Sequence, residues 1–228
     1  MIISFSGLDG AGKTTQIKML LSYYQQCGFK AGSIYELFPD IRYHSVKDLR
    51  RAYDFLQKYD VIHMRFRLNS DLNSIIMRNL ERSQSSKPLV AVAAAIQGYL
   101  DHVSLYQNVL KLLLNEEKII LFDRYFYDEF AFKHMYGCPS FILRTLYANV
   151  READIPFYIR IPPQICQRRN CVRPEETATI YQDIKRISKL GKNFDYIATL
   201  KGMTVLDGTD DANKISEQII SKLNCTGK

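Results

Sequence analysis

The segment GLDGAGKTT at residues 7–15 decides the expected fold, because it follows a short apolar run, IISFS, and precedes a stretch with helical periodicity. It fits the pattern G-x-x-x-x-G-K-S/T, with Lys13 and Thr14 at its end. In this pattern the glycines let backbone N–H groups surround phosphate oxygens, the lysine reaches the β- and γ-phosphates, and the threonine hydroxyl faces Mg²⁺. A helix that begins at Lys13 would also direct its positive N-terminal end at the anion. The segment therefore predicts a strand, a phosphate-binding loop and a helix.

The rest of the chain alternates between predicted strands and helices. Short apolar runs at 32–38, 119–123, 154–163 and 203–208 are typical of buried strands, and they are separated by helical patterns such as 13–27, which Gly28 closes. In the last helix Ile215, Ile219 and Leu223 share one face, with Thr209 or Asp210 as the expected N-cap. Such strands between helices predict an α/β fold, a P-loop three-layer α/β/α sandwich with a central parallel sheet of about five strands.

Length and spacing predict one domain over residues 1–228, with a helical insertion around 41–92 and a helical lid around 164–192. The insertion contains HMRFRLNSDL, in which Arg65 and Arg67 are expected to lie on an extra pair of surface helices. Between residues 160 and 192 eight Lys or Arg residues stand against three acidic ones, which fits either a solvated face or a lid that faces phosphate.

Composition narrows the class of protein. The longest apolar run, residues 89–96, is far shorter than the roughly 20 residues of a membrane helix, and the N-terminus lacks the features of a signal peptide. The five cysteines form no C-x-x-C pair, so reduced thiols and a cytoplasmic location are expected. The net charge of +7 suits anionic ligands, although it is modest for a nucleic-acid-binding protein of this length.

A second polar signal lies at the end of the predicted strand IILFD. Asp123 would lie at the carboxyl edge of the sheet, where a carboxylate can support Mg²⁺ beside Thr14; the alternative is an aspartate that caps the next segment. Arg124 follows directly, and its planar guanidinium suits a phosphate.

Four segments in order carry a resemblance to a known family: GLDGAGKTTQ, EEKIILFDRYFYDEFAF, DIPFYIRIPPQICQRR and VLDGTDDANKISEQI. They resemble thymidylate kinases over residues 1–40 and 93–225. The resemblance implies a P-loop kinase fold, ATP and Mg²⁺ as cofactors, nucleotide substrates and a homodimer.

The resemblance also implies roles for individual residues. Asp9 would orient the acceptor, Arg124 would bind its phosphate, and Arg168 or Arg173 would reach the transferred phosphoryl group from the lid, with Arg169 as a third candidate. Residues implied to bind ATP are Gly7, Asp9, Gly10, Ala11, Gly12, Lys13, Thr14, Thr15 and Arg168. Residues implied to bind the metal are Thr14 and Asp123. Residues expected to bind the acceptor are Phe38, Arg42, Gln97, Tyr99, His102, Arg124 and Tyr125.

The acceptor side departs from the family pattern. The usual arginine before the Phe-Pro-acid motif is replaced by Leu37, and the segment around His102 contains no arginine that could contact a base. Asp128 stands where a small residue is usual, facing either solvent or sugar hydroxyls.

The leading hypothesis is ATP-dependent phosphoryl transfer to a nucleoside monophosphate, most simply dTMP to dTDP. The alternatives are a kinase with a changed acceptor and a nucleotide-binding regulatory module with weak or no turnover. A nucleic-acid-dependent NTPase is the weakest, because no second motor motif is present.

Overall fold

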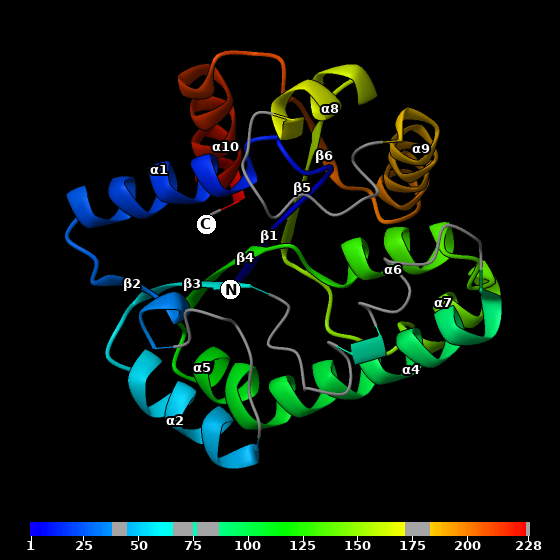
Figure 1. Cartoon of the computed structure of the whole chain (residues 1–228). Helices are drawn as coiled ribbons and strands as arrows, with labels where there is room; N and C mark the ends of the chain where they lie inside the picture. Colours follow the sequence, from blue (N-terminus) through cyan, green and yellow to red (C-terminus); the bar gives the residue numbers. More distant parts are fainter. Residues whose placement is uncertain (38–44, 66–74, 77–86, 172–182, 227–228) are drawn as a thin grey trace.

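A parallel sheet of six strands forms the centre of the molecule in the computed structural model, which describes residues 1–37, 45–65, 75–76, 87–171 and 183–226 (Figure 1). The strands lie in the order β2-β3-β4-β1-β5-β6, and every neighbouring pair is parallel. Their bounds are β1 Ile2–Ser6, β2 Ala31–Ser33, β3 Val61–Arg65, β4 Ile119–Asp123, β5 Ile155–Arg160 and β6 Thr204–Asp207. The predicted α/β class is confirmed, with one strand more than the expected five.

Helices cover both faces of the sheet (Figure 1). On one face α1 packs against α10, and on the other α6 packs against both α4 and α9. The longer helices are α1 Lys13–Gln26, α2 Val46–Leu56, α4 Pro88–Leu105, α6 Phe126–Met135, α8 Pro163–Cys171, α9 Ile184–Leu200 and α10 Ala212–Thr226. The shorter helices are η1 Ile34–Glu36, the π-helical η2 Tyr106–Leu110, α5 Lys111–Asn115 and α7 Ser140–Leu146.

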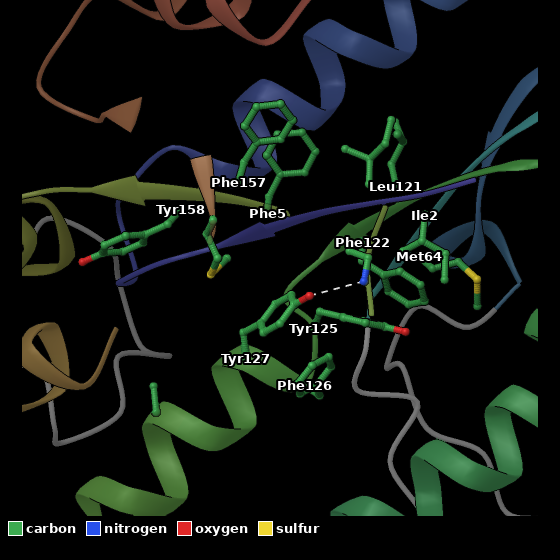
Figure 2. Close-up of a cluster of buried hydrophobic side chains, with 14 of the residues drawn as sticks. Ile2, Phe5, Met64, Leu121, Phe122, Tyr125, Phe126, Tyr127, Phe157 and Tyr158 are labelled. Carbon is green, nitrogen blue, oxygen red and sulfur yellow. Dashed lines mark hydrogen bonds between the residues drawn. The ribbon is translucent and has the colours of Figure 1, made fainter. Parts of the chain in front are cut away.

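The core lies on both faces of the central strands, whose side chains alternate between them (Figure 2). Phe5 and Phe157 stack with ring centroids 5.4 Å apart on the side of α1, while Phe122 lies on the opposite side, 4.8 Å from the ring of Tyr125. The same alternation places Leu121 and Asp123 on the α1 side of β4. The sheet thus directs Asp123 toward the beginning of α1.

The prediction of a helical insertion is wrong for residues 61–65. This segment is β3, which lies between β2 and β4, and Val61, Ile62 and Met64 are fully buried. The run was missed because His63 and Arg65 interrupt its apolar pattern. Arg67 lies outside the described residues, whereas α2 is a helix within the predicted insertion.

Two smaller expectations also need correction. The strand expected over 32–38 ends at Ser33, because the Ser33 hydroxyl and the Glu36 carboxylate form a capping box that starts η1. The last helix is capped neither by Thr209 nor by Asp210. Asp211 caps it, accepting a 2.9 Å hydrogen bond from Asn213 N, while Ile215, Ile219 and Leu223 are buried as predicted.

Within the described residues, one helical stretch is long and apolar enough to pass a length-and-composition test for a membrane span, Pro88–Asn115. Core helices pass the same test, and here Ala91, Ala94, Ala95 and Leu105 are buried inside the fold.

Candidate active site

The phosphate loop depends on glycines that no other residue can replace at low cost. Gly7, Gly10 and Gly12 have φ values of 141°, 80° and 97°, in the region that favours glycine. A Cβ at Gly7 would also lie 2.4 Å from the carbonyl oxygen of Ile159, so β5 leaves no room for a side chain there. In contrast, nothing lies within 4 Å of a Cβ built at Gly12. The loop is therefore tight against the sheet and open where α1 begins.

Lys13 is buried beneath this loop. Its Nζ donates hydrogen bonds to the carbonyl oxygens of Gly7 at 3.0 Å and Leu8 at 2.9 Å. Burial lowers the pKa of Lys13, with Arg65 adding to the lowering, while Asp123 and Asp128 oppose it. An ammonium in this position gains a strong partner when a polyphosphate enters the loop.

Thr14 and Asp123 lie together at the opening of the loop. The Thr14 hydroxyl donates a 2.8 Å hydrogen bond to Asp123 Oδ2, which joins the first turn of α1 to the end of β4. A hydroxyl beside a carboxylate at a helix N-terminus fits Mg²⁺ bound to the phosphates of ATP. Thr15 is exposed on the same turn and Ala11 is buried within the loop. These residues would hold the metal–nucleotide complex, and the metal would neutralise charge on the transferred phosphoryl group.

Arg124 bridges two carboxylates at the same edge. Its Nη2 forms an ion pair with Asp9 Oδ1, and its Nη1 donates a 3.1 Å hydrogen bond to Asp128 Oδ1. Its backbone has φ 71°, unusual for a residue other than glycine, and its N–H is bound to Phe5 O at 3.0 Å. Asp128 is buried, so of the two orientations expected from the sequence the one that faces solvent is wrong.

Arg65 belongs to this cluster although it was predicted to lie on a surface helix. Its Cα is the register partner of Asp123 across β3 and β4, and its positive charge opposes the burial that raises the pKa of Tyr35. Its Nε is buried and has no hydrogen-bond partner among the described residues. The sequence signal was the strand itself: an arginine at the end of a short buried strand lies at the ligand-binding edge of a parallel sheet.

Helix α8 packs directly on the phosphate loop. Asn170 Nδ2 donates a 2.9 Å hydrogen bond to Asp9 O, and the thiol of Cys166 donates to the same oxygen at 3.1 Å. Arg169 Nη1 donates to Gly10 O at 2.8 Å and to Gly208 O at 3.3 Å, whereas Arg168 is exposed. Arg169 thus braces the loop, and Arg173 lies outside the described residues.

The residues expected to bind the acceptor do not gather in one place. Phe38 and Arg42 lie outside the described residues, and Gln97 donates a 2.9 Å hydrogen bond to Asp101 on the next turn of α4. The strand beside β4 is β3 rather than β2, so β2 and η1, which precede Phe38 in the chain, do not adjoin the strand that ends in Asp123.

The side chains of Tyr99, His102 and Tyr125 contact residues outside the phosphate loop. Tyr99 and His102 line a cavity of about 380 Å³ together with Arg151. Arg151 forms an ion pair with Asp154, and Asp154 accepts a hydrogen bond from Ile2 N at the start of β1. Tyr125 is wholly buried, and its hydroxyl donates to Arg151 O at 2.7 Å. Burial raises the pKa of Tyr125 and lowers the pKa of His102 to about 4. We therefore place Tyr125 in the core rather than among acceptor contacts.

Comparisons with known proteins identify the family and the fold. The family model described as thymidylate kinase matches residues 56–219, well over half of the chain. The chain is 24% identical to "Thymidylate kinase" of Fervidobacterium nodosum over 98% of each chain, and 21% identical to "Probable thymidylate kinase" of Thermococcus kodakarensis over 97% of this chain and 96% of that one. The crystal structure of thymidylate kinase from Ehrlichia chaffeensis superposes with a TM-score of 0.59 at 18% identity, covering 98% of both chains, which shows a shared fold. On the span of the family match, the chain belongs to the thymidylate kinase family.

Proposed function

We propose that the protein transfers the γ-phosphoryl group of ATP to a nucleoside monophosphate, with dTMP as the expected acceptor. The observation that carries this proposal is that residues suited to bind ATP and residues suited to bind the acceptor lie together at one edge of the sheet. Lys13, Thr14 and Asp123 form a donor half, and the ion pair between Asp9 and Arg124 joins it to an arginine on the acceptor half. Family membership supports the same reaction class.

The reaction asks the chain for positioning and charge rather than for a covalent intermediate. Lys13 and the backbone N–H groups of the loop would bind the β- and γ-phosphates, and Arg124 would leave Asp9 to bind the acceptor's phosphate. Asp9, which is one-third exposed, would then be released to orient the acceptor. Arg168 and Arg173 remain the proposed sources of a further positive charge over the transferred group. Two other expectations from the family, a homodimer and a cytoplasmic location, stay predictions.

A coupled assay of ADP release tests the proposal, with Mg·ATP and a panel of dTMP, dUMP, dCMP, UMP and CMP. We expect dTMP to raise ADP release far above the background with water, and Lys13→Ala to abolish the increase. If no monophosphate raises ADP release while Mg·ATP still binds, the chain is a nucleotide-binding module and the proposal fails.

A changed acceptor is the second candidate, and one observation favours it. Where the family resemblance leads one to expect a base-contacting arginine, α4 offers an amide and a carboxylate, Gln97 and Asp101, bonded to each other. Amides and carboxylates read different base edges from those read by arginine. In the same panel, a monophosphate other than dTMP with the highest kcat/KM would support this reading.

A further inference from the structure

We propose that Asp128 is a positioning residue for Arg124, holding one side of its guanidinium fixed while the other side exchanges Asp9 for the acceptor's phosphate. The proposal rests on the proposed function, because it assigns Arg124 to the acceptor. It concerns the aspartate that stands where the family pattern has a small residue.

The two carboxylates bound to Arg124 differ in how firmly they are held. The Asp128 side chain is 3% exposed and that of Asp9 is 34% exposed. Asp128 Oδ2 also accepts a 2.6 Å hydrogen bond from the Ser6 hydroxyl and a 3.1 Å hydrogen bond from Tyr125 N. Asp128 is therefore tied to β1 and to the start of α6, whereas Asp9 is one-third exposed and has, besides Arg124, a 4.0 Å contact between its Oδ1 and Lys13 Nζ.

The bonds divide the guanidinium into two sides. Nη1 faces Asp128 and Nη2 faces Asp9. Arginine binds phosphate through two parallel N–H groups of its planar guanidinium. If the plane of the guanidinium is already fixed in the free protein, binding phosphate costs less side-chain entropy. A carboxylate that holds Nη1 fixes this plane and leaves Nη2 directed at Asp9, the partner that the acceptor's phosphate would replace.

Burying Asp128 is costly, which argues against an incidental cap. Burial raises its pKa, and the positive charges of Arg124 and Lys13 act against this rise. A serine or asparagine at the third position of α6 would bond to Tyr125 N without burying a charge. Among the residues that the structure describes, Arg124 is the cation that Asp128 contacts directly, at 3.1 Å, so the buried charge acts most strongly there.

The test compares Asp128→Asn with Asp154→Asn. Asparagine keeps the shape and an acceptor for Ser6 and Tyr125 N, but it loses the charge that holds Arg124. Asp154 is the matched control, because it also pairs with an arginine, Arg151, and also accepts from a backbone N–H, that of Ile2, at the other end of the sheet. Each variant is measured for the Kd of Mg·ADP by calorimetry and for kcat and KM with dTMP, or with the best monophosphate of the panel.

We expect Asp128→Asn to lower kcat/KM for the acceptor by about tenfold or more and to leave the Kd of Mg·ADP within about twofold, as for the loss of one charge-assisted contact. Asp154→Asn should change neither kcat/KM nor the Kd of Mg·ADP, even if this variant has a lower midpoint of thermal unfolding than the wild-type protein. Equal losses for donor and acceptor, or equal effects of the two variants, overturn the proposal. If Asp128→Asn does not fold, Ser6→Ala takes its place, since it loosens the same carboxylate without changing charge, and a smaller loss confined to the acceptor is expected.

The proposed function and this inference fail in different ways. If the wild-type protein turns over no monophosphate, the same comparison is made on the Kd of dTMP with Mg·ADP present, and weaker dTMP binding by Asp128→Asn alone supports the role of Asp128. If the wild-type protein binds no monophosphate either, both ideas are wrong.

Discussion

Asp9 in the phosphate loop and Arg124 at the end of β4 form an ion pair that joins the proposed donor and acceptor halves of the site. The pair joins residues that are 115 positions apart in the chain, and it exists because β1 and β4 are neighbours in the sheet. Under the proposed function, Arg124 has to leave Asp9 to bind the acceptor's phosphate, so the ion pair would compete with the acceptor.

Replacing Asp9 by asparagine should separate binding from turnover. We expect Asp9→Asn to bind a monophosphate about two- to fivefold more tightly, because a partly exposed ion pair of at most about 1 kcal/mol no longer has to be broken. The value of kcat should fall, because the acceptor loses the carboxylate that orients it. Calorimetry with dTMP and initial rates measure both. Asp60→Asn, at an exposed carboxylate before β3, is the control, and weaker dTMP binding by Asp9→Asn would contradict the prediction.

The ammonium of Lys13 should lower the stability of the free protein and be required for its activity. Lys13→Met keeps the length of the side chain but removes an ammonium whose burial lowers its pKa, so the free energy of unfolding should stay equal or increase. The value of kcat should fall by about 10²- to 10³-fold, as when an electrostatic contact to the transition state is removed. Urea unfolding and ADP release are the measurements, with Lys18→Met on the exposed side of α1 as the control. A large loss of stability together with normal turnover would refute this.

Arg65 should contribute to binding of the acceptor monophosphate and not to binding of the nucleotide donor. It ends β3 beside Asp123 at the carboxyl edge of the sheet, where its guanidinium would place a positive charge near the acceptor's phosphate. Arg65→Gln should raise KM for the monophosphate by about tenfold and leave the Kd of Mg·ADP unchanged. Arg51→Gln, an exposed arginine on α2, should change neither. A rise in the Kd of Mg·ADP instead would move Arg65 to the donor half.

The donor half could be predicted from sequence because its signals are local. The loop, the first turn of α1 and the strand that ends in Asp123 each have a pattern within about ten residues, and topology brings such strand ends to one edge. The contact between Thr14 and Asp123 follows from that topology.

The acceptor half could not be predicted because it depends on strand order and on side-chain direction. The strand β3 carries His63 and Arg65, so its pattern resembles neither a buried strand nor an amphipathic one. A prediction from sequence that lacks β3 places the motif after β2 next to the strand that ends in Asp123. The direction of Asp128 depends on Ser6 of a distant strand, and no local pattern encodes that contact.

Alanine substitutions at Gly7 and Gly28 should separate the cost of a positive φ from the cost of a steric clash. Both have positive φ, 141° and 90°, but a Cβ at Gly7 meets the Ile159 carbonyl oxygen at 2.4 Å and a Cβ at Gly28 meets nothing within 4 Å. Gly28→Ala should lower the free energy of unfolding by about 1 kcal/mol, from backbone strain alone. Gly7→Ala adds a clash with β5 and should cost several times more, as measured by urea unfolding. Equal costs would mean that the loop moves freely away from β5.

His102 should make the protein less stable in mild acid. Its pKa is lowered by burial to about 4, below its ordinary value of 6.5, so in this range the unfolded chain binds a proton that the folded chain excludes. The free energy of unfolding should therefore fall as the pH falls from about 6.5 to about 4, by about 1.4 kcal/mol per pH unit from this group. Urea unfolding across this range should show a shallower dependence for His102→Phe, by about one proton. If the two slopes are equal, His102 carries the same charge in the folded and unfolded chains, and the cavity it lines with Tyr99 and Arg151 must admit enough water to hydrate an imidazolium.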